Sequence, residues 1–351
     1  MYASYHPYSL EFKKPVLTSR SRMTHKHGYY LTIEASGTRG VGECSYIEGL
    51  SIDDPGGYEA ALLNICSEVE EIADAYFESG TLPLELLIRY PSIAFGLETA
   101  LLDLRNGGKH EIIKGSEFYA GKKAIPINGL VWMGDEGFMR EQIEQKLVDG
   151  FRCIKIKVGA IDFDEECRLI ESIRARYGPA QMEIRLDANG AFTADNVHAK
   201  LKRLSAYTIH SIEQPVKPQQ YLLMHNLCRE NIISIALDEE LIGTSESFIR
   251  QRLLETIRPQ YIILKPSLLG GLAVCDDWIA QAAKLNIPWW ATSALEGNIG
   301  LNAIAQWAAS KDTTMIQGLG TGSLYTNNIP SPLMIEMGHL RYDRTKNWAA
   351  L

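Results

Sequence analysis

The spacing of hydrophobic and polar positions changes near residue 120 of this 351-residue chain. In the first part, strand-like runs bounded by turn residues precede two stretches with apolar residues at helical spacing. The strand-like runs are Tyr8–Phe12, Tyr29–Ala35 and Gly40–Cys44, and the helix-like stretches are Tyr58–Glu78 and Ile93–Leu104. We therefore predict an α+β domain over residues 1–120, with a mobile loop at the polar stretch Thr18–Gly28.

Over residues 121–329, short β-rich runs alternate with amphipathic, helix-like stretches. Eight such runs start about 23–29 residues apart: Ile125–Trp132, Cys153–Val158, Met182–Asp187, Ile209–Glu213, Ile232–Asp238, Tyr261–Lys265, Ile287–Thr292 and Thr314–Gln317. The unbroken repeat predicts an α/β fold with a parallel βα barrel, and no G-x-G-x-x-G follows the first run to favour an open nucleotide-binding sheet. We expect the tail, residues 330–351, to return to the first domain.

Charged residues stand at the ends of five consecutive runs. They are Lys157, Asp187, Glu213, Asp238 and Lys265, and they follow one another at intervals of 30, 26, 25 and 27 residues. Catalytic groups of βα barrels lie at the carboxyl ends of the strands. The spacing therefore predicts that these five side chains share one mouth of the barrel, although each alone would more often be a helix cap or a solvated charge.

Two lysines alternate with apolar residues in the second run. Because side chains of a strand alternate between faces, Lys155 and Lys157 point to the same side, which in a barrel is the inside. A lysine among other cations gives up its proton more readily, so Lys157 is a candidate base. Lys265 comes from the far side of the barrel and would oppose it.

The three acids, Asp187, Glu213 and Asp238, offer hard oxygen ligands of the kind that Mg²⁺ binds, with Mn²⁺ as a substitute. Zinc is disfavoured because no histidine stands at a matching strand end. Glu239 and Glu240 leave open which side chain of that run binds. A divalent cation beside a substrate carboxylate stabilises the enediolate formed when the neighbouring carbon loses its proton.

The net charge of −8 and the absence of a dense basic run argue against nucleic-acid or membrane partners. A local group of cations could still attract a small dicarboxylate, with Lys155, Asn189 and Arg185 as candidate contacts. Arg185 is two residues before Asp187 on the same predicted strand and should also point inward. An outward Arg185 that pairs with a helix is expected equally. Six scattered cysteines and the lack of a secretory signal favour the cytoplasm, and the sequence is compatible with an oligomer.

The K-x-K pair and the segments D-A-N-G (187–190), E-Q-P (213–215), L-D-E (237–239) and L-K-P-S-x-x-G-G (264–271) resemble the muconate-cycloisomerase-like subgroup of the enolase superfamily. The resemblance spans nearly the whole chain. It implies a modified (β/α)₇β barrel with an α+β capping domain.

Residues 289–309 and 318–328 are similar to those of the o-succinylbenzoate synthase family of menaquinone biosynthesis. This resemblance implies syn dehydration of 2-succinyl-6-hydroxy-2,4-cyclohexadiene-1-carboxylate. In that reaction Lys157 would remove the α-proton and protonate the departing hydroxide, while Lys265 stays charged against the ring. Ser293 and nearby amides would bind the succinyl carboxylate, and the Thr18–Gly28 loop would close over the substrate.

Other reactions stay open. N-succinylamino acid racemisation would use the same lysines and metal. Dipeptide epimerases are less similar, because they carry an acid pair for the substrate ammonium after the last strand and Gly318–Gly322 offers no acid. Mandelate-racemase-like enzymes are also less similar, because they use a histidine base where this chain has Ser293–Glu296. Glu296 itself is expected equally to touch substrate or to be structural. A catalytically silent barrel that binds a small acid or a partner protein is the remaining alternative.

Overall fold

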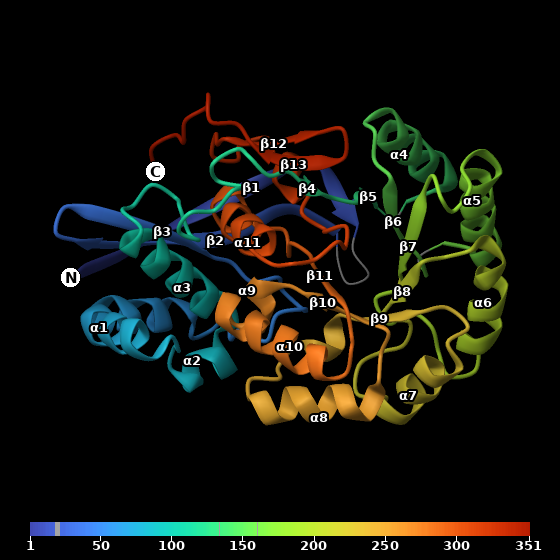
Figure 1. The fold of residues 1–351 in the computed structure, drawn as a ribbon, viewed down its shortest axis with the longest axis horizontal. Coiled ribbons are helices and arrows are strands. Elements are labelled where there is room, and N and C mark those ends of the chain that lie inside the picture. The colour runs from blue at the N-terminus through green and yellow to red at the C-terminus, as the bar shows by residue number, and fades with distance from the viewer. Residues whose placement is uncertain (18–21, 133, 160) are drawn as a thin grey trace.

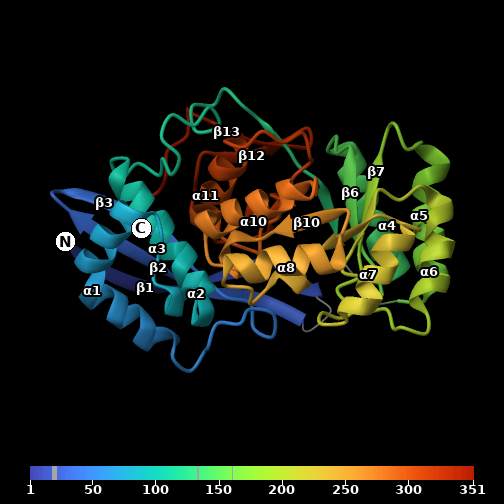
Figure 2. The same ribbon diagram turned by 60° about the horizontal axis from the view of Figure 1, so that its bottom comes forward.

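The computed structural model describes residues 1–17, 22–132, 134–159 and 161–351. A curled parallel sheet surrounded by helices makes up one part of the molecule, and an antiparallel sheet with its own helices lies beside it (Figure 1). This is the predicted fold class, an α/β barrel with an α+β capping domain. Figure 2 shows the long strands of the cap running beneath the barrel helices towards the centre of the molecule.

The cap is built from an antiparallel sheet of order β1-β2-β3 and three helices. The strands are β1 (Tyr2–Leu17), β2 (Arg22–Ala35) and β3 (Thr38–Cys44), and the helices are α1 (Tyr58–Ser79), α2 (Leu84–Arg89) and α3 (Pro91–Arg105). Helix α3 packs against β3 at very short range, since a Cβ atom at Gly42 would lie 1.8 Å from the carbonyl oxygen of Gly96. Only glycine fits there.

The mobile loop expected at Thr18–Gly28 is wrong for most of its length. Strand β2 begins at Arg22 and pairs with β1, with Lys26 opposite Leu10 and Gly28 opposite Tyr8. Residues 18–21 lie outside the described residues. The polar composition of the stretch hid a strand because its backbone hydrogen bonds are made with β1, which does not depend on apolar side chains.

The barrel sheet has seven parallel strands in the order β11-β10-β9-β8-β7-β6-β5. Their bounds are β5 (Gly129–Val131), β6 (Cys153–Lys157), β7 (Glu183–Asp187), β8 (Ser211–Glu213), β9 (Ile235–Leu237), β10 (Tyr261–Leu264) and β11 (Trp289–Ala291). Each lies within one of the first seven runs expected from the sequence. Consecutive strands are neighbours, as in a barrel.

The eighth run, Thr314–Gln317, does not form a regular strand in the described part of the chain. Single parallel bridges replace it: Gln317 pairs with Ile127 and Gly318 with Thr292. The Gln317 amide donates to the Pro126 carbonyl at 2.9 Å, and the Gly318 amide donates to the Ala291 carbonyl at 2.7 Å. These bonds connect the two edges of the curled sheet at this level, so the run closes the barrel without a ladder of its own.

Helices connect the barrel strands and cover the outside of the sheet (Figure 1). The α-helices are α4 (Glu136–Val148), α5 (Phe163–Arg176), α6 (Val197–Leu204), α7 (Tyr221–Glu230), α8 (Ser247–Ile257), α9 (Pro266–Leu269), α10 (Leu272–Lys284) and α11 (Asn298–Ala309). The described residues also form the short 3-10 helices η1 (Ser205–Tyr207), η2 (Glu239–Leu241) and η3 (Thr321–Leu324). Asp135 and Asp162 accept backbone hydrogen bonds at the first turns of α4 and α5, which is why these helices start there.

The tail folds into a hairpin, β12 (Leu333–Glu336) and β13 (His339–Tyr342), which pairs with β4 (Ile125–Pro126) in a third sheet. Farther on, Trp348 packs against the cluster of Tyr30, Val41 and Ile299. The tail thus touches barrel and cap alike.

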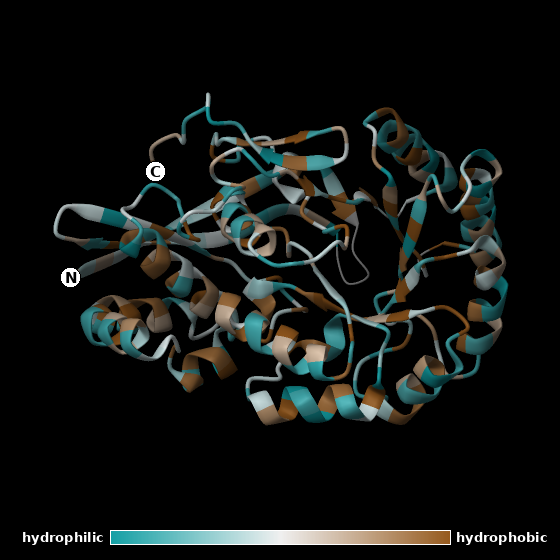
Figure 3. Ribbon diagram, in the orientation of Figure 1, coloured by the Kyte–Doolittle hydropathy of each residue, from teal (hydrophilic) through white to brown (hydrophobic). Residues whose placement is uncertain are grey.

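Hydrophobic side chains of the barrel strands and helices form the largest core, and the cap has a core of its own. In Figure 3 the helices carry both brown and teal segments, as expected for helices with one buried and one solvated face. Among the residues that the structure describes, no helix combines the length and apolar character needed to cross a membrane.

Two cap carboxylates bind helix N-termini of the barrel. Glu98 of α3 accepts a hydrogen bond from the Ala273 amide of α10 at 3.0 Å. Glu43 of β3 accepts from the amides of Gly297 at 2.6 Å and Gly300 at 2.8 Å, at the start of α11. An anion in this position satisfies amides that have no partner within the helix. Both helices begin after the carboxyl ends of their strands, so the cap is held beside the barrel mouth.

Candidate active site

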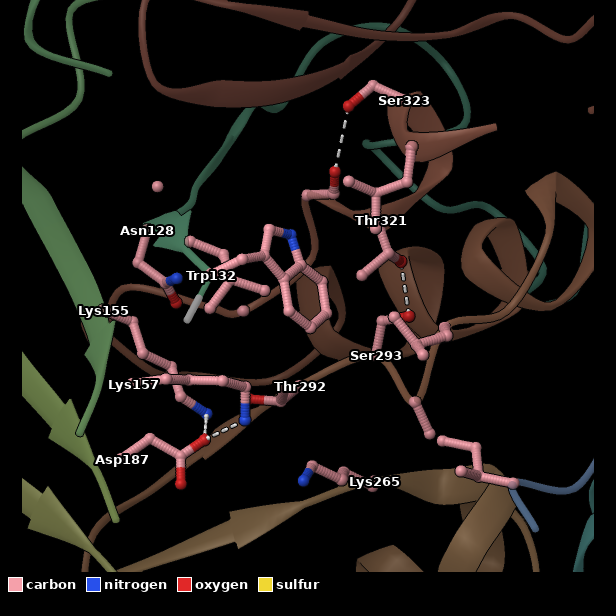
Figure 4. Close-up of a pocket in the computed structure, with 18 of the residues that line it drawn as sticks. Asn128, Trp132, Lys155, Lys157, Asp187, Lys265, Thr292, Ser293, Thr321 and Ser323 are labelled. Atoms are coloured by element: carbon pink, nitrogen blue, oxygen red, sulfur yellow. Dashed lines mark hydrogen bonds and ion pairs between the residues drawn. The ribbon is translucent and has the colours of Figure 1, made fainter. Parts of the chain in front are cut away.

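The five charged residues at the strand ends come together, as their spacing predicts. Lys157 stands opposite Asp187 in the register of β6 and β7, and Asp187 stands opposite Glu213 in the register of β7 and β8. Asp238 and Lys265 directly follow β9 and β10. Figure 4 shows Lys155 and Lys157 reaching towards Asp187, with Lys265 on the opposite side.

Lysines and carboxylates alternate in this cluster. The Nζ atom of Lys155 lies 2.9 Å from Oδ2 of Asp187 and 2.6 Å from Oε2 of Glu213. The Nζ atom of Lys157 lies 2.9 Å from the same Asp187 oxygen. Lys265 pairs with Asp238 and lies 4.0 Å from Oε1 of Glu213. All three carboxylates are at most 2% exposed, so water contributes little to screening their charges.

The pKa values of the acids reflect burial opposed by the lysines. Burial raises the pKa of Glu213 well above its ordinary value, and the neighbouring Asp187 carboxylate acts in the same direction. Burial would also raise the pKa of Asp187 and Asp238. For Asp187 the lysines, Lys155 first among them, outweigh burial and hold the pKa far below its usual range, and for Asp238 Lys265 has this effect.

The lysines respond to the acids more than to each other. Burial by itself would lower the pKa of Lys155, but Asp187 and Glu213 raise it above the ordinary value. Burial opposes the raised pKa of Lys265 in the same way, and Asp238 and Glu213 outweigh it. The acids therefore favour the charged forms of these two lysines.

The donor set fits a hard divalent cation. Three buried carboxylates from neighbouring strands act on one another electrostatically, and burial penalises their negative charge. Oxygen ligands of this kind suit Mg²⁺. Across the described ranges, however, no three His, Cys, Asp or Glu side chains are arranged as a ready metal site. Their oxygens face the three lysine ammonium groups instead.

A cavity of about 140 Å³ opens above this cluster. Lys155, Lys157, Asp187 and Lys265 form its charged floor, whereas Glu213 and Asp238 lie outside the lining. The barrel walls include Asn128, Leu130, Trp132, Asn189, Glu239, Thr292, Ser293, Thr321 and Ser323. The cavity thus combines an ionic floor with an apolar and hydroxyl-rich wall, which suits an organic acid.

Asn189 lies in the cavity, as predicted, and connects two of its walls. Its Oδ1 atom accepts a hydrogen bond from Lys157 at 2.7 Å, and its amide nitrogen donates to Oε1 of Glu239 at 2.9 Å. Its φ of 44° is in the left-handed region that asparagine tolerates. Glu240 turns away from the cavity, where the Gln219 amide donates to it at 2.7 Å. Of the two glutamates beside Asp238, Glu239 is the one in the cavity wall.

Ser293 also lines the cavity, but its hydroxyl is already engaged. It donates to Glu296 and lies 2.5 Å from the Thr321 hydroxyl. A hydrogen bond from Ser293 to a substrate carboxylate would require the hydroxyl to leave Glu296. Glu296 also accepts from the Ser267 hydroxyl at 2.5 Å and the Ala294 amide at 2.7 Å. Glu296 is outside the cavity lining, so its contacts in the structure are those of a support for this wall.

Arg185 does not reach the cavity. It is 2% exposed and points into the barrel, but its Nε atom donates to Glu183 at 2.6 Å and its Nη1 atom to the Ile316 carbonyl at 2.8 Å. The guanidinium carbon lies 4.1 Å from the centre of the Trp290 ring. Arg185 therefore lies inside the barrel below the cavity. It is neither in the cavity lining, as a substrate contact would be, nor paired outward with a helix.

The sequence reasoning missed the contribution of the cap. Ile47, Glu48 and Leu50, which follow β3, line the cavity, whereas the stretch expected to cover it, Thr18–Gly28, has no described residue in the lining. A usable signal was present, because the Gly- and Pro-containing segment 45–57 is a long connection without helical or strand periodicity. Long irregular segments of compact domains often carry function.

Comparison with known proteins agrees with this architecture. The family model described as "Enolase C-terminal domain-like" matches residues 138–345. The o-succinylbenzoate synthase of Desulfotalea psychrophila is 45% identical over 97% of this chain and 98% of its own length. The crystal structure of MenC from Desulfotalea psychrophila LSv54 has a TM-score of 0.84 at 44% identity, covering 97% of this chain and 99% of that one.

The chain belongs to the o-succinylbenzoate synthase family of the enolase superfamily. The fold extends to more distant members of the superfamily. Muconate lactonizing enzyme from Pseudomonas fluorescens, in complex with muconolactone, has a TM-score of 0.82 at 22% identity, covering 97% of this chain and 92% of that one. The o-succinylbenzoate synthases of this superfamily are metal-dependent enzymes in general.

Proposed function

We propose that this enzyme catalyses the magnesium-dependent syn dehydration of 2-succinyl-6-hydroxy-2,4-cyclohexadiene-1-carboxylate to 2-succinylbenzoate. The observation that carries the proposal is the charged cluster at the cavity floor. Lys157 and Lys265 come from opposite sides of the barrel and flank Asp187, while Glu213 and Asp238 are buried beside it outside the lining. Membership of the o-succinylbenzoate synthase family supports the particular substrate. Manganese is expected to substitute for magnesium.

Asp187, Glu213 and Asp238 would hold the metal. When bound, the ion would act as a Lewis acid towards the substrate carboxylate and offset the charge that develops there. With Lys157 neutral as the base, Lys155 and Lys265 offset two of the three carboxylates, and an added divalent ion leaves the site positive. That positive charge favours an acidic substrate.

Lys157, in its neutral form, would remove the proton from the ring carbon next to the carboxylate, and the electron pair would pass into an enediolate. Collapse of the enediolate would break the carbon–oxygen bond on the same face. Lys157 would then give its proton to the departing hydroxide, which leaves as water and restores the neutral amine. One base can serve both transfers because syn elimination places both groups on one side of the ring.

Lys265 would stay charged on the other side of the substrate. Its pairing with Asp238 favours the protonated form, consistent with a role in charge stabilisation rather than proton removal. Lys155 would hold Asp187 and Glu213 in place from below. Trp132 and Leu130 supply apolar wall for a six-membered ring.

An ultraviolet assay of the cyclohexadiene substrate with and without Mg²⁺ tests the reaction. Wild-type enzyme should turn over in Mg²⁺ and lose activity with chelator. Lys157→Ala should lose roughly 10²–10⁴-fold in kcat, the usual contribution of a positioned acid or base. Lys202→Ala, which removes an exposed lysine of α6, should behave as wild type. The proposal fails if wild type leaves the diene unchanged.

Proton exchange separates the roles of the two lysines and tests for racemisation. In racemisation, unlike the dehydration above, Lys265 would also act as a base in its neutral form. N-succinyl amino acids in deuterium oxide should then exchange their α-proton in two stereochemical senses, because Lys157 and Lys265 face opposite sides of the substrate. Lys157→Ala and Lys265→Ala should then each lose a different sense. Identical exchange in both variants would contradict the opposed placement.

A further inference from the structure

Residues that follow β3 form a compact turn between the cap and the cavity. The Ile47 carbonyl accepts hydrogen bonds from the amides of Leu50 at 3.0 Å and Ser51 at 2.8 Å, and the Ser51 hydroxyl oxygen accepts from the Ile47 amide at 2.8 Å. Ile47, Glu48 and Leu50 of this turn line the cavity. The turn holds its own shape, so its position over the barrel depends on what anchors its two ends.

One end is anchored by a buried lysine. Lys26 of β2 is 1% exposed, and its Nζ atom donates to the Tyr46 carbonyl at 2.7 Å, one residue before the turn. At the other end Asp53 accepts from the Ser92 amide at 3.0 Å and the Ser92 hydroxyl at 2.8 Å, at the start of α3. Burying an ammonium group costs free energy unless charged or polar partners compensate it.

The compensating charges come from three different segments. Glu43 of β3, Asp53 after the turn and Glu296 of the barrel all attract the Lys26 ammonium. Glu296 in turn accepts the hydrogen bond of Ser293, which lines the cavity on the barrel side. The ammonium of Lys26 is therefore attracted by acids of the cap, of the segment after the turn and of the barrel segment that supports the cavity wall.

We propose that Lys26 is a positioning residue that holds the Ile47–Leu50 turn against the bound substrate. The inference rests on the proposed function for its kinetic readout, because the substrate is the one named above. The proposed catalytic lysines stand at the ends of barrel strands, whereas the hydrogen bond of Lys26 is made with the Tyr46 carbonyl of the cap. Loss of Lys26 should therefore weaken substrate binding and leave the chemical step nearly intact.

A pH dependence follows from the same contacts. Burial lowers the pKa of Lys26 to about 8, and Glu296, Glu43 and Asp53 oppose that shift. Above that pH the amine loses the charge that the three acids attract. We expect the KM of wild type to rise between pH 7 and pH 9. In Lys26→Arg, whose guanidinium stays charged, this rise should be smaller.

Steady-state kinetics at saturating Mg²⁺ test the role. Lys26→Met should raise KM roughly tenfold or more, because the Tyr46 carbonyl and three acids lose their buried partner, while kcat stays within about twofold. Lys26→Arg should recover most of the wild-type KM at pH 7, and Lys13→Met, at an exposed position of β1, should match wild type. An unchanged KM in folded Lys26→Met, or a loss confined to kcat, overturns the proposal.

Hydrogen exchange gives a readout independent of turnover. In Lys26→Met, peptides covering residues 45–53 should exchange faster while barrel peptides keep their protection, and uniform acceleration or none overturns the proposal. If wild type does not turn over the cyclohexadiene, the proposed function fails and this measurement still decides the role of Lys26. If Lys26→Met does not fold, the role of Lys26 is tested with wild type and Lys26→Arg instead. Exchange of the same peptides is measured at pH 7 and pH 9 and corrected for intrinsic rates, and wild type should lose more protection at pH 9 than Lys26→Arg. The same pH dependence in both proteins would overturn the proposal.

Discussion

The ammonium group of Lys157 lies 2.9 Å from Oδ2 of Asp187, so the proposed base is bonded to a proposed metal ligand. The pairing follows from strand register, because the two residues stand opposite one another on β6 and β7. A divalent cation that binds Asp187 must therefore compete with a lysine for the same oxygen. Metal binding and the availability of the base are coupled through this one carboxylate.

The Nζ atom of Lys155 lies at the same distance, 2.9 Å, from Oδ2 of Asp187, so removing Lys157 takes away one of two competing ammonium groups and should tighten metal binding. A hydrogen bond to a charged group contributes about 1.5–3 kcal/mol, so Lys157→Met should bind Mg²⁺ roughly tenfold or more tightly than wild type although it is inactive. Isothermal titration with MgCl₂ measures this, with Lys202→Met as the control expected to match wild type. Equal or weaker binding by Lys157→Met would show that Asp187 is not a ligand or that Lys157 does not compete for it.

Arg185 should matter for stability and not for substrate binding. Arg185→Met removes the bond to Glu183 at 2.6 Å; Glu183 is 26% exposed and can be hydrated, so the loss is that of a hydrogen bond to a charged group, about 1.5–3 kcal/mol. Urea unfolding should show this loss, while the KM of the folded fraction should equal that of wild type, since Arg185 is outside the cavity lining. A raised KM with normal stability would restore Arg185 as a substrate contact.

Glu98 should make stability depend on pH between about 4.5 and 7. Burial raises its pKa from 4.5 to about 7, against the hydrogen bonds from Leu272, Ala273 and Tyr76. A raised folded pKa means that the folded chain holds this proton more tightly. The stabilising contribution is therefore complete below pH 4.5 and is lost as pH rises through about 7.

Glu98→Gln removes the titratable carboxyl group and keeps an oxygen that can accept a hydrogen bond from a backbone amide of α10. The free energy of unfolding of the variant, relative to that of wild type, should thus increase by up to about 3 kcal/mol from pH 4.5 to pH 8, because wild type loses stability over this range. Urea denaturation at the two pH values measures the difference. A relative stability that does not change with pH would mean that Glu98 is charged in the fold over the whole range.

Gly271, where Glu98 meets α10, should not accept a side chain. Its φ is +120°, and a Cβ atom there would lie 2.3 Å from Oε2 of Glu98. Gly80→Ala gives the cost of a left-handed backbone alone, because Gly80 has a φ of +72° and nothing within 4 Å of an added Cβ; Gly271, with a ψ of −176°, lies in a region that essentially only glycine adopts, which adds to its cost. Thermal unfolding should show a cost of about 1–2 kcal/mol for Gly80→Ala and a clearly larger one for Gly271→Ala. Equal costs would mean that Glu98 moves aside freely and that the backbone of Gly271 adds no strain.

The sequence by itself determined the fold class and the five charged residues of the cavity floor and the layer beneath it. Both depend on local regularities: strand alternation sets which side chains point inward, and the βα repeat places strand ends at one mouth. Lys157, Asp187, Glu213, Asp238 and Lys265 could be grouped on that basis, with their roles as base, ligands and opposing cation still to be tested. The length of each strand, and the bridges that replace the eighth one, were not determined at this level.

Only the tertiary structure decides how close to the barrel mouth each inward-pointing charged side chain reaches. Lys155 and Arg185 stand opposite one another in the register and both point inward. Lys155 extends towards the mouth to reach Glu213, whereas Arg185 turns towards Glu183 and the Ile316 carbonyl. Strand parity gives a face but not the direction of a long side chain, which follows whichever buried partner satisfies its charge.

The cap's share of the cavity was likewise settled only by tertiary structure. The turn at Ile47–Leu50 reaches the barrel because Glu43 and Glu98 bind helix N-termini that lie more than 170 residues away in the chain. No local pattern encodes such contacts, since they depend on how two separately folded cores pack. The sequence thus specified which chemical groups are present and which strands carry them. The packing of cap on barrel specified what else surrounds them.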